Sequence, residues 1–386
     1  MSKRKILFLV DHKHRDLPSL SLIGFFLKKK HKIYFRPLSK PDIEIIDPEF
    51  IIISRIIRNK RQMPTINKWQ SEKRKIIVID SEGNQQSKTF LPKISFKPDL
   101  LFIWNKTELE RHSKEIAKYK IKTEICGSPR LDFFHDKFKN FFSEIKKLKK
   151  ELAITKNKVV TFAMNNSYED LSQQHKDKIK ERYYETYYHN YGFEDKLQHM
   201  LECRRRLVET VFFLLKNYEN INIVIKPHPN ENITFWQNLV NENEKLKIMI
   251  GKPINDLLKI SDIHIGMKGC LTIVEASLMK VPNIELDTES KLSEKEFFKE
   301  HLNLALFSSD DENDFKKHFD RLIDDEVSEK EFNDHQIKIN KYVNKYLYKF
   351  DAKRCKDYAN KLDSFINNYE MNKKFNNTNM SNLIRF

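Results

Sequence analysis

Short apolar runs alternate with polar segments along most of the chain. The apolar runs cover residues 6–10, 33–35, 50–53, 76–79, 100–104 and 123–126, and then 159–163, 222–225, 247–250, 263–265 and 283–286. Their length and their β-branched content are typical of buried strands. Segments with helical spacing, such as residues 55–69 and 106–119, lie between several of them. Strands that alternate with helices predict parallel sheets with helices on both faces.

This pattern predicts two α/β units followed by helices. We expect the first unit over residues 1–150 and the second over residues 151–310. The polar, aromatic stretch at about 168–202 predicts a helical insertion, and its tyrosines fit contact with sugar or membrane as well as packing in the core. Helices are expected over residues 311–370, where two capping-box spacings occur, and a flexible, Asn-rich tail over residues 371–386.

Composition indicates a soluble intracellular protein. The chain has 386 residues, enough for two domains, and contains no apolar run near the ~18 to 20 residues that span a bilayer. The apolar run at residues 6–10 ends at Asp11 and His12, so we interpret it as a first strand and not a signal peptide. The four cysteines are scattered, which predicts a reducing cytoplasm with neither disulfides nor zinc.

The net charge of +16 raises the question of a nucleic-acid partner. The lysines are dispersed along the chain and no nucleic-acid-binding motif is present, so we expect no nucleic acid partner. Anionic lipid headgroups or a phosphate-bearing substrate account for the charge equally well.

The segment after the strand at residues 222–225 is the strongest candidate for chemistry. Pro227 and Pro229 end the strand and fix the backbone on both sides of His228. Ligands of open α/β sheets bind beyond the carboxyl ends of such strands. Lys226 adds a point charge and His228 a ring nitrogen, and together they suit a phosphate group.

A second candidate combines a strand, a glycine-containing loop and the start of a helix, over residues 261–276. Gly266 and Gly269 allow close backbone approach, and the first helical amides, with Thr272 nearby, predict an anion site. Glu275, one turn into the helix, suits hydrogen bonds from a ribose. The alternative is a first-turn glutamate that only favours the helix dipole.

Candidate bases lie at two strand ends of the first unit. Residues 80–83 place Glu82 before a glycine, which suits a general base or a solvated turn. Residues 11–16 offer a competing set, in which the bases are Asp11, Asp16, His12 or His14 and Arg15 is an anion clamp. In the turn at residues 127–132, Arg130 either reaches a cleft or pairs with Asp132.

These pieces together resemble a known family. Two α/β units with a cleft and carboxy-terminal helices are similar to the GT-B glycosyltransferase architecture, in which two Rossmann-like domains face each other. More narrowly, the ordered set of motifs resembles bacterial surface carbohydrate biosynthesis proteins. The motifs are Arg15-Asp16-Leu17, Trp104 before Asn105-Lys106, the turn at 127–132, Met164-Asn165-Asn166-Ser167, Lys226 to Asn232 with Trp236, and Gly269-Cys270-Leu271-Thr272 before Glu275-Ala276.

The His-Pro pair also resembles capsule sialyltransferases and Kdo transferases that use CMP-sugars. That resemblance implies that His228 contacts the donor phosphate and that Glu82 is the base. The donor loop of those relatives is serine-rich, whereas the chain has Gly269-Cys270-Leu271-Thr272, and Ser81 stands where they often have a second acid. The motif match adds Cys270, Asn165 and Ser167 to the expected substrate-binding residues.

The resemblance implies a metal-independent glycosyltransferase without a cofactor. It would move a sugar from a nucleotide-sugar, CMP-linked in the narrower reading, to a surface glycan of the capsule or lipopolysaccharide type or to a lipid-linked acceptor. We expect it in the cytoplasm, with peripheral contact at the inner face of the membrane as an open question. Other classes stay open: a nucleotide-sugar epimerase, a glycerophosphate-type polymer transferase, or a non-catalytic partner in glycan assembly.

Overall fold

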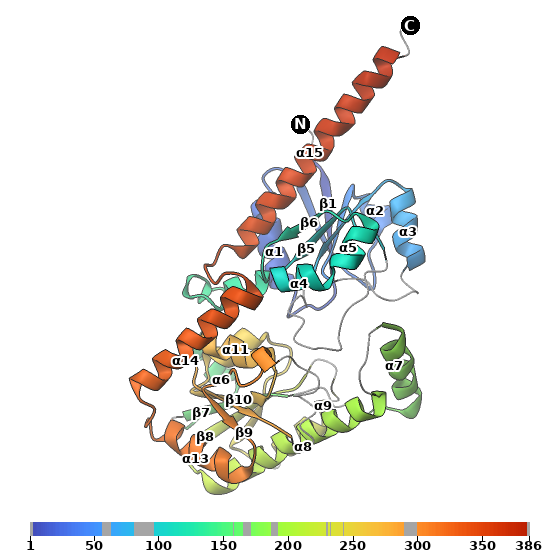
Figure 1. Ribbon diagram of the computed structural model, residues 1–386. Coiled ribbons are helices and arrows are strands. Elements are labelled where there is room, and N and C mark those ends of the chain that lie inside the picture. Colours follow the sequence, from blue (N-terminus) through green and yellow to red (C-terminus); the bar gives the residue numbers. More distant parts are fainter. Residues whose placement is uncertain are drawn as a thin grey trace.

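The structure is a computed structural model, and two parallel six-stranded sheets dominate it (Figure 1). It describes residues 3–55, 63–80, 96–156, 158–164, 171–186, 192–228, 231, 233–241, 243–288 and 299–383. The predicted α/β class, with two units that each carry a parallel sheet, is confirmed. Within these ranges, no helix is both long and apolar enough to cross a membrane.

The first sheet has the strand order β2-β1-β3-β4-β5-β6, and its register is parallel throughout. Its strands are β1 (Lys5–Val10), β2 (Lys32–Pro37), β3 (Phe50–Ile53), β4 (Lys75–Ile79), β5 (Leu100–Ile103) and β6 (Thr123–Ile125). The inner strands are apolar on both sides because helices cover both faces. The order reverses between β1 and β3, which makes the carboxyl ends of these two strands the expected ligand position.

Each face of the first sheet has its own core. On one face, Ile6 and Phe8 pack with α1 (Leu17–Leu27) and with α15 (Arg354–Leu383). On the other face, Leu7 and Leu9 pack with α3 (Met63–Ser71) and the region of α5 (Ser113–Tyr119). Two short helices complete this unit, α2 (Ile43–Ile46) and α4 (Lys106–Arg111).

The C-terminal helix α15 packs against the first sheet. The sequence did not predict this contact. Tyr358, Leu362 and Ile366 of α15 lie in the same core as β1, and Figure 1 shows this helix running up along the first unit and past it. The carboxylate of Asp132 caps its first turn, accepting from the backbone N–H of Arg354 at 2.9 Å and of Cys355 at 2.8 Å. The backbone stays helical to Leu383, through most of the segment expected to be a loose tail.

The second sheet has the order β12-β11-β10-β7-β8-β9. Its strands are β7 (Lys158–Ala163), β8 (Ile221–Lys226), β9 (Leu246–Ile248), β10 (Ile263–Met267), β11 (Asn283–Leu286) and β12 (Phe307–Ser309). Counted within this unit, the order is that of a dinucleotide-binding Rossmann sheet, and it reverses between β7 and β10. The edge strand β12 was missed because a three-residue, half-buried segment has no clear period.

Helices cover both faces of the second sheet. One face carries α8 (Phe193–Asn217) and α13 (Glu312–Ile323), which pack with β8 and β10 around Phe162 and Leu207. The other face carries α10 (Ile254–Lys259), α11 (Leu271–Leu278) and α14 (Glu329–Tyr342). The remaining helices are α6 (Ile145–Glu151) and α9 (Ile233–Asn241), with short turns at Pro129–Phe134, Asp136–Phe138, Lys299–His301 and Val343–Leu347.

The predicted insertion is helical where it is described. Helix α7 (Gln173–Thr186) precedes α8, and α8 is one continuous helix of 25 residues that begins in the insertion and ends in the core (Figure 1). The tyrosine-rich segment at 183–191 lies largely outside the described residues, and its predicted role remains untested.

Candidate functional site: a cationic cleft between the two sheets

A cleft of about 500 Å³ lies between the two sheets. Its walls come from the strand ends at which each sheet reverses its order. In the first sheet, Asp11 to Arg15 follow β1 and Arg55 lies beyond β3. In the second sheet, Ala163 ends β7, Thr272 and Glu275 lie in the helix after β10, and Lys226 ends β8, which neighbours β7. The residues that line it are Asp11, His12, His14, Arg15, Arg55, Arg130, Ala163, Met164, Lys226, Pro227, His228, Lys252, Ile254, Thr272 and Glu275. Both positions at which open α/β sheets bind ligands therefore open into one space.

Cations outnumber carboxylates in the lining of the cleft. Five Arg or Lys side chains line it against two carboxylates, those of Asp11 and Glu275. Most of the cations have an acidic partner: Arg55 contacts Asp11 at 3.1 Å, and Lys252 contacts Glu151 at 3.0 Å. Cations at a concave surface attract and hold anions such as phosphates.

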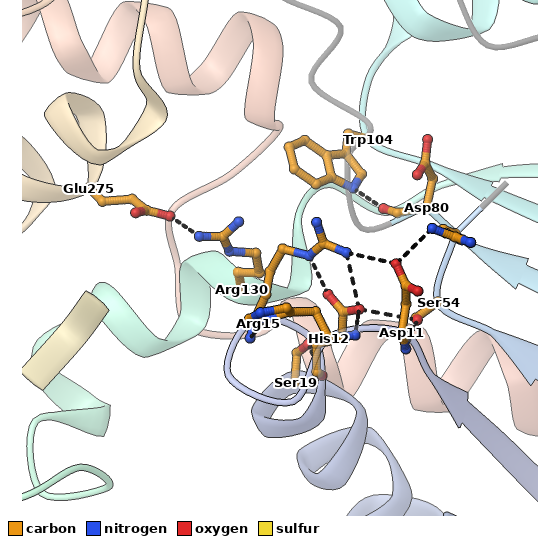
Figure 2. Close-up of polar contacts among 11 residues, drawn as sticks. Asp11, His12, Arg15, Ser19, Ser54, Asp80, Trp104, Arg130 and Glu275 are labelled. Carbon is orange, nitrogen blue, oxygen red and sulfur yellow. Dashed lines mark hydrogen bonds and ion pairs between the residues drawn. The ribbon is translucent and has the colours of Figure 1, made fainter. Parts of the chain in front are cut away.

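Hydrogen bonds between Asp16 and its neighbours, Arg15 among them, hold the loop after β1 in its conformation. Asp16 is 2% exposed and accepts hydrogen bonds from Arg15 Nε at 2.7 Å, from the N–H of His12 at 3.0 Å and from Ser54 Oγ at 3.2 Å. Figure 2 shows Arg15, Asp11, His12 and Ser54 close together, with Arg15 beside Asp11. Asp16 does not line the cleft, so its geometry suits positioning of the loop and not abstraction of a substrate proton.

Two histidines of the same loop face the cleft as neutral rings. Burial, and then the charge of Arg15, lower the pKa of His12, whose Nδ1 accepts from the N–H of Arg15 at 3.2 Å. Burial and then the charge of Lys226 lower the pKa of His14. The second effect crosses the cleft, because Lys226 belongs to the other sheet. His14 is the more available base, since no hydrogen bond occupies its ring within the described part of the chain.

Glu231 and Trp236 hold the loop after β8 in place. Oε2 of Glu231 accepts from the N–H of His228 at 3.2 Å and from the indole Nε1 of the fully buried Trp236 at 3.2 Å. This arrangement explains why a Trp follows the Pro-His-Pro segment. Burial lowers the pKa of Lys226. Its ammonium has no ion-pair partner among the described residues, so it is available to an anionic ligand.

The first turn of α11 forms the wall opposite the β1 loop. Gly269 has φ +81°, a left-handed conformation that turns the chain from β10 into the helix. Glu275 is 2% exposed, and one of its oxygens pairs with Arg130 of the first unit (Figure 2). Its Oε2 is buried without a partner in the described structure. Burial raises the pKa of Glu275, and the guanidinium of Arg130 opposes that effect.

The turn at residues 127–132 resolves the alternative left open for Arg130. Arg130 reaches the cleft and contacts Glu275, whereas Asp132 is occupied with the start of α15. Gly127 has φ +76°, and its carbonyl accepts from the hydroxyl of Tyr358 at 2.8 Å. The turn therefore holds the start of α15 through Asp132 and Gly127, and it places Arg130 at the cleft. Trp104 is structural as well, since its Nε1 donates to the carbonyl of Asp80 at 2.6 Å.

The expected site residues fall into three groups. Those that line the cleft are Arg15, Arg130, Lys226, His228, Thr272 and Glu275. Those that are described but do not line it are Asp16, Gly269 and Cys270. Those outside the described residues are Glu82, Asn165 and Ser167. Arg55 and Lys252 also line the cleft, although neither carries a motif by which the sequence would mark it.

Solved structures with this fold are known, although no family model and no curated protein matches the sequence. The chain is similar to the wall teichoic acid polymerase TagF with CDPG, with a TM-score of 0.58 and 9% identity over 95% of this chain and 89% of that chain. It is also similar to the S. aureus MnaA–UDP co-structure, with a TM-score of 0.51 and 13% identity over 94% and 97%. The chain therefore has the GT-B fold, in which two Rossmann-like domains face a cleft.

Proposed function

We propose that the protein is a bacterial transferase that moves a sugar from a nucleotide-sugar to a surface glycan acceptor. The observation that carries this proposal is the cleft itself. It lies where both sheets reverse their strand order, and it combines a Lys with no ion-pair partner among the described residues, Lys226, with further cations from both units. A nucleotide phosphate supplies the negative charge that such a site lacks.

The second unit is the proposed donor side. Lys226, the ring of His228 and the first amides of α11 beyond Gly269 would hold the phosphate. Glu275, which lines the cleft and pairs with Arg130, would accept a hydrogen bond from a ribose hydroxyl. Cys270, Asn165 and Ser167 stay in the proposal as neighbours of that pocket through the motif resemblance. These groups would stabilise the departing phosphate in the manner of fixed oxyanion donors.

The first unit is the proposed acceptor side, with His14 as the base. The sequence offered Glu82 and, in the loop at residues 11–16, Asp11, Asp16, His12 or His14 as the base. Hydrogen bonds from Arg15, His12 and Ser54 occupy the carboxylate of Asp16, whereas the neutral ring of His14 lies in the cleft. His14 would take the proton of an acceptor hydroxyl, whose oxygen attacks the anomeric carbon. The bond from that carbon to the phosphate oxygen then breaks, and the nucleotide leaves with the electron pair.

A glycerophosphate-type transfer is the second candidate, and one finding favours it. The TagF structure with CDPG has this fold over 95% of the present chain. In that reaction the acceptor oxygen would attack the phosphorus next to glycerol, and CMP would leave. The five cations of the cleft suit the charge of such a diphosphate as well.

The acceptor would be a growing capsule or lipopolysaccharide-type glycan, free or lipid-linked, at the inner face of the cytoplasmic membrane. The basic surface expected from the net charge of +16 favours peripheral contact with anionic lipid. Residues 1–150 and 151–310 remain the proposed acceptor and donor domains, with α15 added to the first.

A nucleotide-release assay tests the proposal and separates its alternatives. The protein is incubated with CMP-sialic acid, UDP-N-acetylglucosamine or CDP-glycerol and a cell-envelope glycan extract, and the nucleotide products are separated by chromatography. UDP from a UDP-sugar indicates glycosyl transfer, and CMP from CDP-glycerol indicates glycerophosphate transfer. Formation of a UDP-sugar epimer without acceptor would instead indicate the epimerase alternative. No product from any donor would contradict the proposed function.

Two variants make the assay specific to the cleft. His14→Ala is expected to lower turnover by ~10²- to 10⁴-fold, the usual contribution of a general base. His135→Ala, at a half-buried histidine outside the cleft, is the matched control and should retain activity. Equal turnover of His14→Ala and the control would refute His14 as the base.

A further inference from the structure

A chain of hydrogen bonds joins five polar side chains and reaches the cleft at Thr272. It connects Ser261, Thr161, His264, Thr272 and Cys270. The successive distances are 2.7 Å from Ser261 Oγ to Thr161 Oγ1, 3.0 Å from Thr161 Oγ1 to His264 Nδ1, 3.2 Å from His264 Nε2 to Thr272 Oγ1 and 3.1 Å from Thr272 Oγ1 to Cys270 Sγ. His264 is fully buried, whereas Thr272 is partly exposed and lines the cleft.

The inner end of this chain fixes the direction of its hydrogen bonds. Ser261 Oγ lies 2.8 Å from the carbonyl oxygen of Leu257, which only accepts, so the single hydroxyl proton of Ser261 points there. Thr161 then donates its own proton to Ser261 at 2.7 Å, which is much closer than the other acceptor, the carbonyl of Ile263 at 3.4 Å. Because the proton of Thr161 is committed, its oxygen accepts from His264, and the imidazole proton is therefore on Nδ1.

The outer end follows from the charge state of the ring. Complete burial lowers the pKa of His264 to about 3, so the ring is neutral and Nε2 carries no proton. Thr272 must donate to Nε2. The sulfur of Cys270 is the competing acceptor at 3.1 Å, but a thiol sulfur accepts weakly, and choosing it would leave a buried ring nitrogen unpaired. The thiol instead donates to Thr272.

From this geometry we infer that Thr272 presents an oxygen lone pair to the cleft, and that it binds a hydroxyl or amine of the nucleoside and not a phosphate oxygen. This reverses the expectation that Thr272 belongs to the anion site. Its hydroxyl proton points inward, so an anion beside it meets an acceptor. The inference deepens the proposed function and rests on a nucleotide occupying this cleft.

His264 is then a positioning residue, since it acts on the ligand only through Thr272. It selects hydrogen-bond donors at this point of the cleft. Phosphate binding is left to Lys226, the other cations, the ring of His228 and the backbone amides of α11.

Isothermal titration with two probes tests the role of Thr272. CDP or UDP, whichever binds more tightly, and inorganic pyrophosphate are titrated into the wild type, Thr272→Val and, as a matched control, Thr155→Val at an exposed threonine. We expect Thr272→Val to weaken nucleotide binding roughly 3- to 10-fold and to leave pyrophosphate affinity unchanged. A parallel loss for pyrophosphate, or an unchanged nucleotide affinity, would overturn the inference.

Nitrogen-15 NMR of the histidine-labelled protein tests the proton placement without any ligand. The ring signals that disappear in His264→Asn belong to His264. They should show a protonated Nδ1 and an unprotonated Nε2 from pH 5 to 8. A proton on Nε2 would overturn the inference even if nucleotides bind. Failure of all nucleotides to bind would overturn the proposed function, but the spectrum would still report where the proton of His264 lies.

Discussion

Replacing Glu285 with Gln should change how stability depends on pH. Glu285 is 1% exposed on β11, where Oε2 accepts from the N–H of Leu304 at 3.2 Å and Oε1 has no partner in the described structure. The charged groups that act on it are Lys268, after β10, and Lys338, on α14. Burial outweighs both lysines and raises the pKa of Glu285 from 4.5 to about 7.

Proton linkage gives the direction in which the free energy of unfolding changes with pH. Because the folded-state pKa lies above the unfolded one, the protonated carboxyl favours folding. This contribution is fully present below about pH 4.5 and is lost as the pH rises through about 7. At about 1.36 kcal/mol for each pKa unit, the loss between pH 4.5 and pH 8 is on the order of 3 kcal/mol. Gln keeps the shape and the acceptor for Leu304 and does not ionise.

Urea unfolding of the wild type and Glu285→Gln at pH 4.5 and pH 8 measures this effect. Relative to the wild type, the free energy of unfolding of Glu285→Gln should be about 3 kcal/mol higher at pH 8 than at pH 4.5. Glu326→Gln, at an exposed glutamate, is the control and should show no such difference. The reasoning is refuted if Glu285→Gln follows the wild type at both pH values.

Three further substitutions test contacts that hold the elements around the cleft together. In each case urea unfolding measures the free energy of unfolding. Arg130→Ala should lower the free energy of unfolding by about 3 kcal/mol because it leaves Glu275 buried without its cation, and pairing it with Glu275→Leu should recover most of the loss; a double variant as unstable as the single one would contradict this. Asp132→Ala should cost about 2 kcal/mol because two buried N–H groups of α15 lose their acceptor, and a loss below ~0.5 kcal/mol would exclude the cap. Gly127→Ala should cost more than about 2 kcal/mol, since φ is +76° and a Cβ would lie 2.7 Å from the carbonyl oxygen of Leu347; a neutral effect would contradict this.

The sequence was informative where local patterns decide structure. Apolar runs located the long inner strands such as β1 and β8, because a strand buried on both faces has a plain composition. The Pro-His-Pro segment and the glycine loop before α11 singled out Lys226, His228, Thr272 and Glu275, which line the cleft because they follow strand ends.

Other features depend on contacts between distant residues and left no local signal. Helix α15 packs on the first sheet through Tyr358 and is capped by Asp132, which is more than two hundred positions earlier in the chain. Arg55 and Lys252 enter the cleft as single basic side chains in a lysine-rich sequence. The orientation of the Thr272 hydroxyl depends on Ser261 and Thr161, and no spacing rule connects these residues.

Calorimetric titration of CDP and UDP tests whether the cleft binds a nucleotide through Lys226. The proteins compared are the wild type, Lys226→Met and, as a matched control, Lys216→Met at an exposed lysine of α8. We expect the wild type and the control to bind at least one of these nucleotides equally well. Lys226→Met should bind it roughly 10- to 100-fold more weakly, the value of a lost charge-assisted hydrogen bond. Undiminished binding by Lys226→Met, or no binding by the wild type, would contradict a nucleotide site in this cleft.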